Sequence, residues 1–318
     1  SGVGKTRAEM RGALEAGVLC FNVESEDELT LLSAIAVESG RTARISLRVN
    51  PDVDAGTHPY ISTGLKGNKF GIAHADAAAA YRRAAALPGL QIAGIDCHIG
   101  SQITAIEPYL DALDRLLDLV ESVEALGIAI GHIDLGGGLG ITYTDETPPA
   151  AETLIRALLE RIDARGHGQR KILVEPGRSL VGNAGVLVSE VLYMKPGAER
   201  NFCIVDAAMN DLMRPAMYGA WMTIVPCRRR DIQAVRCDVV GPICESGDWL
   251  GRDRELAVEA GDFIAVLSAG AYSMSMASNY NTRGRAAEIM VSGDQAWLIR
   301  AREQAEELFR NERLLPVG

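Results

Sequence analysis

Short apolar strands alternate with long amphipathic helices through the first half of the chain, and this alternation is the strongest constraint on the fold. The strand-like runs are CFNVES, ARISLRVNP, IAGIDCHIGS, IGHIDLGGG and KILVEPGR. A helix is predicted to begin at Ser25, which forms a capping box with Glu28, and to end near Gly40. Further helices are predicted from Glu107 to Leu126 and over roughly 150–165. This order predicts a parallel α/β sheet or barrel.

Polar and apolar residues also alternate within these strands. Successive strand side chains point to opposite faces, and a strand covered by helices on both faces would be almost continuously apolar. One face of the predicted sheet is therefore polar. Its residues are Asn22, Glu24, Ser46, Arg48, Asn50, Asp96, His98, His132 and Asp134. A polar interior near the carboxyl ends of the strands is typical of (β/α) barrel enzymes, although any one such residue could be purely structural.

After about residue 183 the pattern changes to short β-type runs separated by Gly, Pro and Asp. They are GVLVSEVLYM, FCIVDAAM, WMTIVP, AVRCDVVGPIC, DFIAVLSAGAY and AEIMVSG, and a charged helix, QAEELFRNERLL, is predicted to close the chain. These runs predict a mostly antiparallel β domain. We therefore expect two domains, a partial (β/α) barrel over residues 1–183 and a β domain over residues 184–318.

Composition excludes several classes of protein. The net charge of −10 argues against a nucleic-acid partner, because phosphate-backbone binding needs a basic surface. No apolar run approaches the roughly 18 residues that a membrane helix needs. The six cysteines form no C-x-x-C pair, so neither a metal site nor a disulfide framework is expected. We therefore expect a reducing, cytoplasmic location.

Two turns carry the clearest chemical signals. In DLGGGLG, Gly136, Gly137 and Gly138 follow a strand, and glycine lets backbone N–H groups approach an anion closely. This segment predicts a phosphate cradle, with a simple tight turn as the alternative. In VEPGR, Glu175 ends a strand three residues before Arg178. The pair suits a ligand with a cationic ring nitrogen and an anionic phosphate, and a salt bridge between the two residues is the alternative.

The first residues, SGVGKT, contain the last three positions of the nucleotide-binding pattern G-x-x-x-x-G-K-[ST]. Taken alone they favour a P-loop ATPase or GTPase. However, the first glycine of the pattern and its strand are missing, and the β half has no place in that fold. We instead expect a turn on the catalytic rim of the barrel, in which Gly4 and Lys5 serve turn geometry and solubility.

Six motifs together resemble the fold-type III pyridoxal-phosphate decarboxylases, which combine a (β/α)8 barrel of the alanine racemase type with a β domain. In order they are CHIGSQ, DLGGGLG, VEPGR, RPAMYGA, GPICESGD and GAYSMSMASNYN. Within that group, CESGD and the run RVNPDVDAGTHPYISTGLKGNKFGI resemble the diaminopimelate-specific subfamily. The resemblance covers essentially the whole chain. It implies decarboxylation of meso-2,6-diaminopimelate to L-lysine and CO2, the last step of lysine biosynthesis, by a homodimer with its active site at the interface.

The resemblance also implies which residues bind pyridoxal 5′-phosphate. His98 would stack on the pyridine ring, Ser101 would lie beside the cofactor, and Glu175 would pair with the pyridinium nitrogen. A protonated ring is the electron sink that stabilises the carbanion left by CO2 loss. The remaining cofactor-binding positions, most of them at the phosphate, would be Gly136, Gly137, Gly138, Pro176, Gly177, Arg178 and Tyr272.

Substrate binding is implied for a second set of residues. Cys244 and Glu245 would reach in from the partner subunit, where Cys244 would donate a proton to the carbanion and Glu245 would bind the distal ammonium. A buried apolar cysteine is the alternative for Cys244. Arg214 and Tyr218 are four residues apart, so one face of a helical turn could present both. The implied substrate-binding residues are Arg178, Arg214, Tyr218, Glu245 and Tyr272.

The sequence departs from the family at the lysine that forms the Schiff base, which normally lies in a Y-A-x-K-A-N-like motif near the start of the barrel. None of the lysines matches it; they are Lys5, Lys66, Lys69, Lys171 and Lys195. A barrel also needs eight strands, whereas only five are found. We therefore expect that the N-terminal strands of the barrel, with this lysine, are missing. A decarboxylase of the ornithine or arginine type and a non-catalytic homologue are the alternatives.

Overall fold

The computed structural model describes residues 1–54 and 68–316. The chain divides into two compact units. The first comprises Ser1–Ile141 and Thr147–Ser179, and the second comprises Thr142–Glu146 and the chain from Leu180 onward. The boundary expected after residue 183 separates a cofactor-binding domain from a β domain by function. That functional boundary stays a prediction.

A parallel sheet forms the centre of the first unit, with the strand order β1–β2–β4–β5–β6 and a short β3 paired with β2. The five predicted strands are all present. They are β1 (Phe21–Val23), β2 (Ala43–Asn50), β4 (Leu90–Asp96), β5 (His132–Asp134) and β6 (Lys171–Leu173). The sequence does not predict β3 (Ile72–Ala73), because two residues are too few to show a period.

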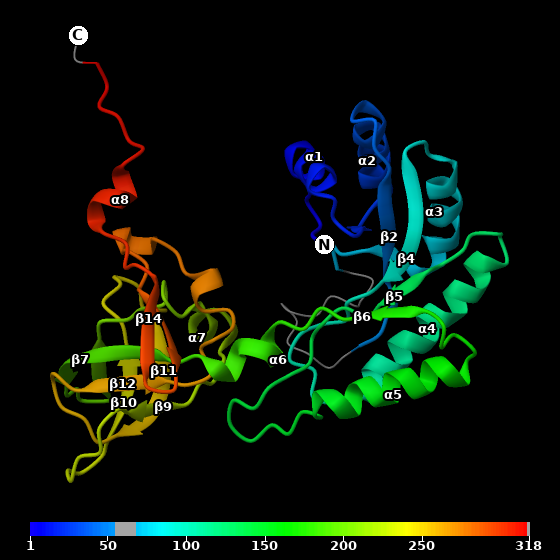
Figure 1. Ribbon diagram of the computed structural model, residues 1–318. Helices are drawn as coiled ribbons and strands as arrows, with labels where there is room; N and C mark the ends of the chain where they lie inside the picture. Colours follow the sequence, from blue (N-terminus) through cyan, green and yellow to red (C-terminus); the bar gives the residue numbers. More distant parts are fainter. Residues whose placement is uncertain (55–67, 317–318) are drawn as a thin grey trace. The chain divides into compact units, whose positions relative to one another are not determined.

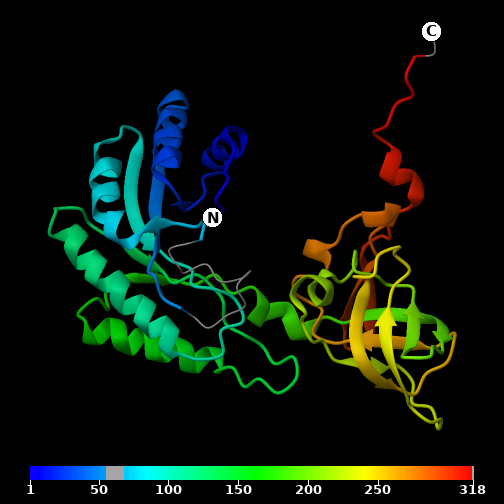
Figure 2. The same cartoon turned by 180° about the vertical axis from the view of Figure 1, so that it is seen from behind.

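Helices α2 to α5 follow the strands and lie along one side of this sheet, as the two opposite views show (Figures 1 and 2). The helices of the first unit are α1 (Arg7–Ala16), α2 (Glu26–Glu38), α3 (His74–Ala86), α4 (Glu107–Glu124) and α5 (Ala151–Ala164). The one-turn α6 (Arg178–Val181) begins in the first unit and ends in the second. Parallel strands connected by helices place all their carboxyl ends at one edge of the sheet.

The caps of the first two helices differ from prediction. Ser25 accepts the N–H of Glu28 at the start of α2, but the Glu28 side chain turns to the backbone N–H of Glu24 instead of completing the predicted capping box. A complete box is present at α1, where Thr6 and Glu9 bond reciprocally. Thr6 of the nucleotide-like SGVGKT segment is therefore a helix cap.

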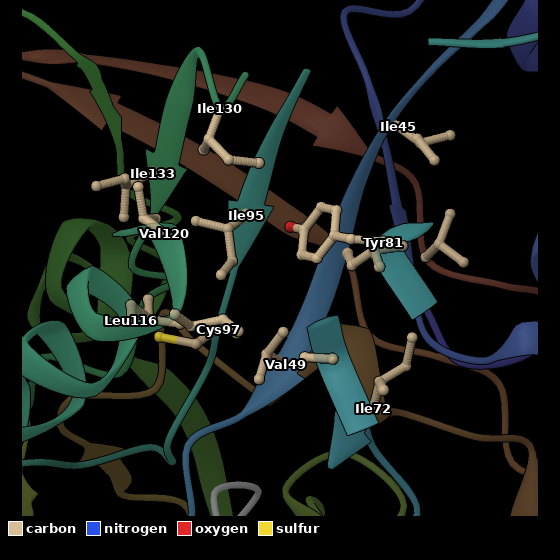
Figure 3. Close-up of a cluster of buried hydrophobic side chains, with 14 of the residues drawn as sticks. Ile45, Val49, Ile72, Tyr81, Ile95, Cys97, Leu116, Val120, Ile130 and Ile133 are labelled. Carbon is tan, nitrogen blue, oxygen red and sulfur yellow. The ribbon is translucent and has the colours of Figure 1, made fainter. Parts of the chain in front are cut away.

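Apolar side chains from the strands and helices form a continuous core (Figure 3). Ile45 of β2, Ile95 of β4 and Ile133 of β5 are fully buried, as is Leu116 of α4. Tyr81 of α3 is also fully buried, and its hydroxyl donates to the carbonyl of Gly94 at 2.8 Å. A buried phenol needs such a partner, since an unsatisfied hydroxyl would cost stability.

The second unit is a mixed sheet in the order β11–β10–β8–β7–β12–β9, in which every neighbouring pair except β10 and β8 is antiparallel. An α/β fold followed by a mostly antiparallel β fold is thus confirmed. The strands are β7 (Leu187–Lys195), β8 (Asn201–Val205), β9 (Ile224–Pro226), β10 (Val235–Val240), β11 (Trp249–Leu256) and β12 (Phe263–Val266).

A separate hairpin and two short helices complete this unit. The hairpin pairs β13 (Glu288–Ser292) with β14 (Gln295–Arg300), and the helices are α7 (Met213–Tyr218) and α8 (Ala305–Phe309). The closing helix is shorter than predicted, because Leu314 and Leu315 beyond it are exposed and pack against nothing that would continue it. No helix in the described part of the chain is both long and apolar enough to cross a membrane.

Candidate active site

The carboxyl ends of the parallel strands bring together four acidic side chains and one arginine. Glu24 follows β1, Arg48 lies on β2, Asp96 and Asp134 end β4 and β5, and Glu175 follows β6. The strand register pairs Arg48 with Asp96, and Asp96 with Asp134. All of these except Glu175 are buried. The polar face predicted from strand periodicity is therefore present, and its charged side chains are buried inside the first unit.

Arg48 and Glu24 form a buried ion pair, with 2.8 Å between Nη1 and Oε1 and side chains only 10% and 1% exposed. The second Glu24 oxygen accepts the backbone N–H of Gly71 at 2.9 Å. The guanidinium also lies over the ring of Phe70, 5.0 Å from its centroid. These contacts satisfy the pair from several sides, as buried charges require.

Acidic groups outnumber basic ones at this edge, and two of them are perturbed. Burial raises the pKa of Asp96 well above its usual value; the charge of Asp134 adds to this and Arg48 opposes it. Burial also raises the pKa of Asp134, partly offset by the N–H of Gly136. Within the described residues, Oδ1 of Asp96 is buried without a hydrogen-bond partner. Such a site favours a ligand that brings a positive charge or a proton.

His98 follows β4 and presents a neutral ring. Its Nδ1 accepts the backbone N–H of Gly137 at 3.1 Å, which places the ring proton on Nε2. Burial, with a contribution from Arg48, lowers the pKa of His98 to about 4. An uncharged imidazole is the form that can stack on an aromatic ring without bringing a second cation.

The glycine loop after β5 is too closely packed for any other residue. A Cβ at Gly137 would lie 2.2 Å from the carbonyl oxygen of Glu175, and Gly136 and Gly138 have φ values of 65° and 102°. The N–H groups of Gly136 and Gly137 already donate to Asp134 Oδ1 and His98 Nδ1. The tight-turn interpretation is therefore supported, and two of the three predicted phosphate-binding amides are engaged within the protein.

The VEPGR turn separates its two charged residues. Glu175, Pro176 and Gly177 are exposed, and Glu175 Oε1 accepts from Ser1 Oγ at 2.8 Å and Asn22 Nδ2 at 3.4 Å. Arg178, in contrast, is buried at the start of α6 and donates to the hydroxyl of Ser101 at 3.0 Å. This contact brings Ser101 together with Arg178.

Lys5 has a role that the sequence did not predict. Its Nζ lies 2.6 Å from Glu28 Oε1 and 2.7 Å from the carbonyl oxygen of Asn22, and both side chains of the ion pair are largely buried. The expectation that Lys5 serves solubility is therefore wrong. Glu28 also accepts the backbone N–H of Glu24. Lys5 is thus linked through Glu28 to the backbone of Glu24 at the acidic edge. The nearby sequence offered no signal for a pair 23 residues apart.

The remaining lysines lie as follows. Lys171 begins β6, at the amino end of its strand, and Lys195 ends β7 in the second unit, both as predicted. Lys69 lies over the ring of Phe70. Lys66 lies outside the described residues.

The second unit carries the other predicted residues. Arg214 and Tyr218 both lie on α7, and the buried Arg214 guanidinium lies over the ring of Tyr143 at 4.5 Å. Tyr272 is 39% exposed and has a positive φ of 58°, an uncommon conformation for a bulky residue that often marks a functional site.

Cys244 and Glu245 lie on the turn between β10 and β11, and both are exposed. The alternative of a buried apolar Cys244 is therefore wrong. The sequence did not point to Tyr280, whose hydroxyl donates to Glu245 Oε2 at 2.5 Å. That tyrosine lies within the recognised motif GAYSMSMASNYN, so the motif was the signal that could have found it.

Comparison with known proteins defines the class of this fold and site. Residues 1–182 match the family "Pyridoxal-dependent decarboxylase, pyridoxal binding domain". The diaminopimelate decarboxylase of Pseudomonas fluorescens is 60% identical over 317 residues, which cover 99% of this chain and 76% of that protein. The Vibrio cholerae enzyme is 54% identical over 316 residues, 99% of this chain and 75% of that protein.

Solved structures agree with the sequence relatives. Diaminopimelate decarboxylase from Helicobacter pylori, complexed with L-lysine, has a TM-score of 0.92 and 41% identity, covering 98% of this chain and 77% of that one. The chain belongs to the pyridoxal-dependent decarboxylases and, within them, to the diaminopimelate decarboxylase family. The P-loop alternative is wrong.

The residues present fit the cofactor of this family, pyridoxal phosphate. The excess of carboxylates, with Asp96 Oδ1 lacking a partner, suits a protonated pyridine ring. The neutral His98 offers a flat face, and the Gly138 amide and the exposed Gly177 turn remain for an anion. Conversely, no group of His, Cys, Asp or Glu within the described ranges could hold a metal ion.

Proposed function

We propose that this protein decarboxylates meso-2,6-diaminopimelate to L-lysine and CO2 with pyridoxal phosphate. The observation that carries the proposal is the acidic edge of the parallel sheet, where Glu175, Asp96 and Asp134 meet the neutral ring of His98. It occurs in a chain 60% identical to a diaminopimelate decarboxylase. This arrangement stabilises a cationic aromatic ring, which is what the reaction needs.

In this proposal residues 1–183 bind the cofactor, together with Tyr272 from residues 184–318. Pyridoxal phosphate supplies an electron sink for the electron pair released when the bond to the departing carboxylate breaks. Glu175 keeps the ring nitrogen protonated, because a carboxylate beside it favours the charged form. His98 would stack on the ring, while Ser101 and Tyr272 would lie beside the cofactor. Its phosphate would be held by Gly136, Gly137 and Gly138 and by Pro176, Gly177 and Arg178; among the loop amides Gly138 would donate directly, because those of Gly136 and Gly137 donate within the protein.

Residues 184–318 complete the substrate site in the proposal. Glu245 binds the distal ammonium of the substrate, and Cys244 protonates the α-carbon after CO2 has left, regaining its proton from water. The exposure of both side chains supports these roles, because a group that meets substrate must be accessible. Arg178, Arg214, Tyr218 and Tyr272 bind the rest of the substrate.

We further propose a cytoplasmic homodimer in which Cys244 and Glu245 serve the partner's site. Their exposure on a turn of the second unit is compatible with a role outside their own subunit. Sedimentation of the purified protein tests the dimer, and a monomer that retains full activity would contradict it.

Carbon dioxide release from meso-diaminopimelate, L-ornithine and L-arginine tests the reaction in a form of the protein that also carries the family's Schiff-base lysine, which none of Lys5, Lys66, Lys69, Lys171 and Lys195 matches. We expect release from meso-diaminopimelate alone, and about a 100-fold lower kcat in Glu175→Gln, the scale for losing one preorganised electrostatic contact. Glu15→Gln, an exposed glutamate on α1, is the matched control. Ornithine or arginine turnover would support the alternative substrates. Failure to bind pyridoxal phosphate, measured by calorimetry, would support a non-catalytic homologue.

A further inference from the structure

The proposed ligand for the distal ammonium, Glu245, does not stand alone in the structure. Its side chain is exposed on the turn after β10, where a glutamate would ordinarily sample many rotamers. The hydroxyl of Tyr280, 35 residues further along the chain, donates to Glu245 Oε2 at 2.5 Å. The Glu245 carboxylate raises the pKa of Tyr280, so the phenol keeps its proton and remains a donor.

The other carboxylate oxygen lies close to Gly247. A Cβ at Gly247 would lie 3.1 Å from Glu245 Oε1, a distance tighter than ordinary van der Waals contact. Glycine at this position therefore leaves the space that Oε1 uses. With Oε2 engaged by Tyr280, Oε1 is the oxygen left to accept a hydrogen bond from a ligand.

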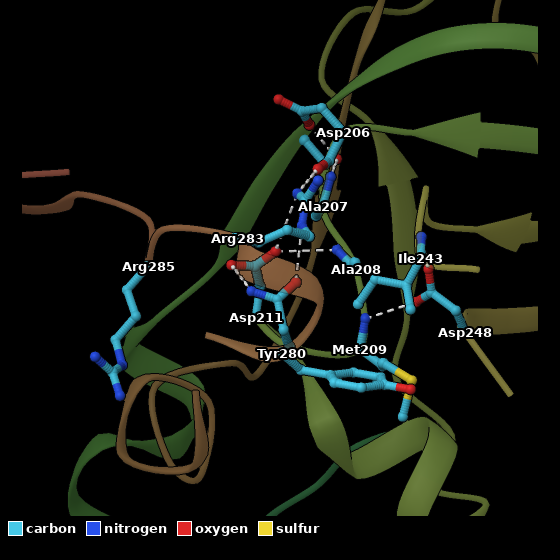
Figure 4. A network of polar contacts seen from close by, with 12 residues as sticks. Asp206, Ala207, Ala208, Met209, Asp211, Ile243, Asp248, Tyr280, Arg283 and Arg285 are labelled. Atoms are coloured by element: carbon cyan, nitrogen blue, oxygen red, sulfur yellow. Dashed lines mark hydrogen bonds and ion pairs between the residues drawn. The ribbon is translucent and has the colours of Figure 1, made fainter. Parts of the chain in front are cut away.

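The turn that carries Glu245 is itself fixed. Asp248 is buried, and its two oxygens accept the N–H groups of Met209 at 2.7 Å and Ile243 at 2.8 Å (Figure 4). The N–H of Asp248 donates to the carbonyl of Glu245 at 3.0 Å. Backbone mobility of the turn is thus restricted before any ligand arrives.

The segment that carries Tyr280 is anchored in the same way. Arg283 donates to the side-chain oxygen of Asn210 at 2.9 Å and to the carbonyl of Asp206, and Ser278 donates its N–H to the carbonyl of Asn210 at 3.0 Å. Asn281 and Thr282, directly after Tyr280, both have a φ of 57°. Positive φ is costly for a β-branched threonine, and such strain persists only where the surroundings impose it.

We propose that Tyr280 is a positioning residue that orients the Glu245 carboxylate toward the distal ammonium of the substrate, and so contributes to selection of a diamino substrate. This inference rests on the proposed function, in which Glu245 binds that ammonium. Preorganising one carboxylate before binding removes part of the ordering cost from the binding step. Tyr280 thereby acts through Glu245 and does not itself take part in bond breaking.

The test uses a pair of probes that differ only in the distal ammonium. L-lysine and L-norleucine share the α-amino acid and the carbon chain, but norleucine lacks the terminal nitrogen. Their dissociation constants for the pyridoxal-phosphate-loaded protein are measured by calorimetry. For Tyr280→Phe we expect about fivefold weaker binding of L-lysine and unchanged binding of norleucine, the scale of one lost hydrogen bond. In turnover, KM for meso-diaminopimelate should rise while kcat is retained.

Two further variants separate positioning from a structural role. Gly247→Ala crowds Glu245 Oε1 from the other side and should weaken L-lysine binding with the same selectivity. In a Glu245→Gln background, Tyr280→Phe should have no additional effect, because both changes act on one contact. Tyr193→Phe, at an exposed tyrosine of β7, is the matched control.

Several results would overturn the inference. They are equal weakening of lysine and norleucine, unchanged lysine binding in Tyr280→Phe, and an undiminished effect in the Glu245→Gln background. So would a wild-type protein that binds norleucine as tightly as lysine. A protein that shows the expected binding pattern but releases no CO2 from diaminopimelate would refute the proposed function and leave the inference standing.

Discussion

The two units hold their candidate site residues in opposite ways. In the parallel-sheet unit, Arg48 and Glu24 form a buried ion pair and Asp96 is buried too, so the chemistry of this edge and the stability of the fold depend on the same residues. In the β unit, Cys244 and Glu245 stand exposed on a turn whose shape is fixed by other residues. The difference predicts that mutations at the buried charged residues of the first unit alter stability and activity together, whereas mutations at Cys244 and Glu245 alter activity alone.

The largest expected effect on stability is at Arg48. Arg48→Met should lower the free energy of unfolding by about 3–5 kcal/mol, because it leaves Glu24 charged and buried without its partner. Urea denaturation measures this. The matched control is Arg156→Met, which removes an ion pair with side chains 65% and 80% exposed and should change stability by less than about 1 kcal/mol. Equal effects at the two arginines would remove the contrast between buried and exposed charges.

Cys244 tests the other side of the comparison. Cys244→Ala should lower kcat about 100-fold, the lower range for losing a general acid, and leave the unfolding free energy within about 0.5 kcal/mol. Steady-state kinetics and urea denaturation give the two values. Cys227→Ala, also at an exposed free cysteine, should change neither. A Cys244→Ala protein that is strongly destabilised would show that this turn belongs to the folding core after all.

His98 should make the first unit sensitive to acid. Its pKa is about 4 in the folded state against 6.5 for a free imidazole, so between these values the unfolded chain binds a proton that the folded protein does not. Stability should therefore fall as pH drops from 6.5 towards 4, by roughly 2 kcal/mol for this half-buried ring. His98→Asn lacks this contribution. The raised pKa values of Asp96 and Asp134 act in the opposite direction, and they cancel when wild type and variant are compared.

Two measurements check the His98 prediction. The difference in unfolding free energy between wild type and His98→Asn is followed across this pH range, and the ring resonances of His98 are followed by NMR. A ring that titrates near its ordinary pKa would contradict the buried neutral imidazole, and a pH-independent difference would do the same.

The smallest expected effect is at the cap of α1. Thr6→Ala removes the hydroxyl that accepts the N–H of Glu9 and donates to Glu9 Oε2, and should cost about 1 kcal/mol of stability. Thr153→Ala, at an exposed threonine within α5, should change stability by only a few tenths of a kcal/mol. Thermal unfolding compares the two. A loss of activity in Thr6→Ala beyond that explained by unfolding would revive a ligand-binding role for SGVGKT.

Sequence periodicity predicted the parallel sheet and its polar face well, because a strand repeats every two residues and its burial is written into each short run. It could not predict which polar residues pair across strands. Arg48 lies on β2 and Glu24 follows β1, while Lys5 lies before α1 and pairs with Glu28 on α2. Such contacts depend on the packed fold, which explains why Lys5 was assigned to solubility and Glu28 to a capping box.

The β unit was less predictable from local pattern. Cys244 and Glu245 were identified only through the family resemblance, since nothing in their spacing signals chemistry. Tyr280 was missed even though its motif was recognised, because its partner lies 35 residues away on another turn. Where loops position the side chains and no regular repeat exists, the structure is needed to show which side chains are in contact.

One short segment limits how far the two units can be treated as modules. Residues Thr142–Glu146 lie between β5 and α5 in the chain yet belong to the second unit. There the Arg214 guanidinium lies over the ring of Tyr143, and the hydroxyl of Thr223 donates to the Tyr143 carbonyl. The chain therefore passes from one unit to the other more than once. Cutting it after Ser179 would separate Arg214 from the ring on which it rests. During synthesis, the second unit can close around Tyr143 only once the strands made much later have left the ribosome.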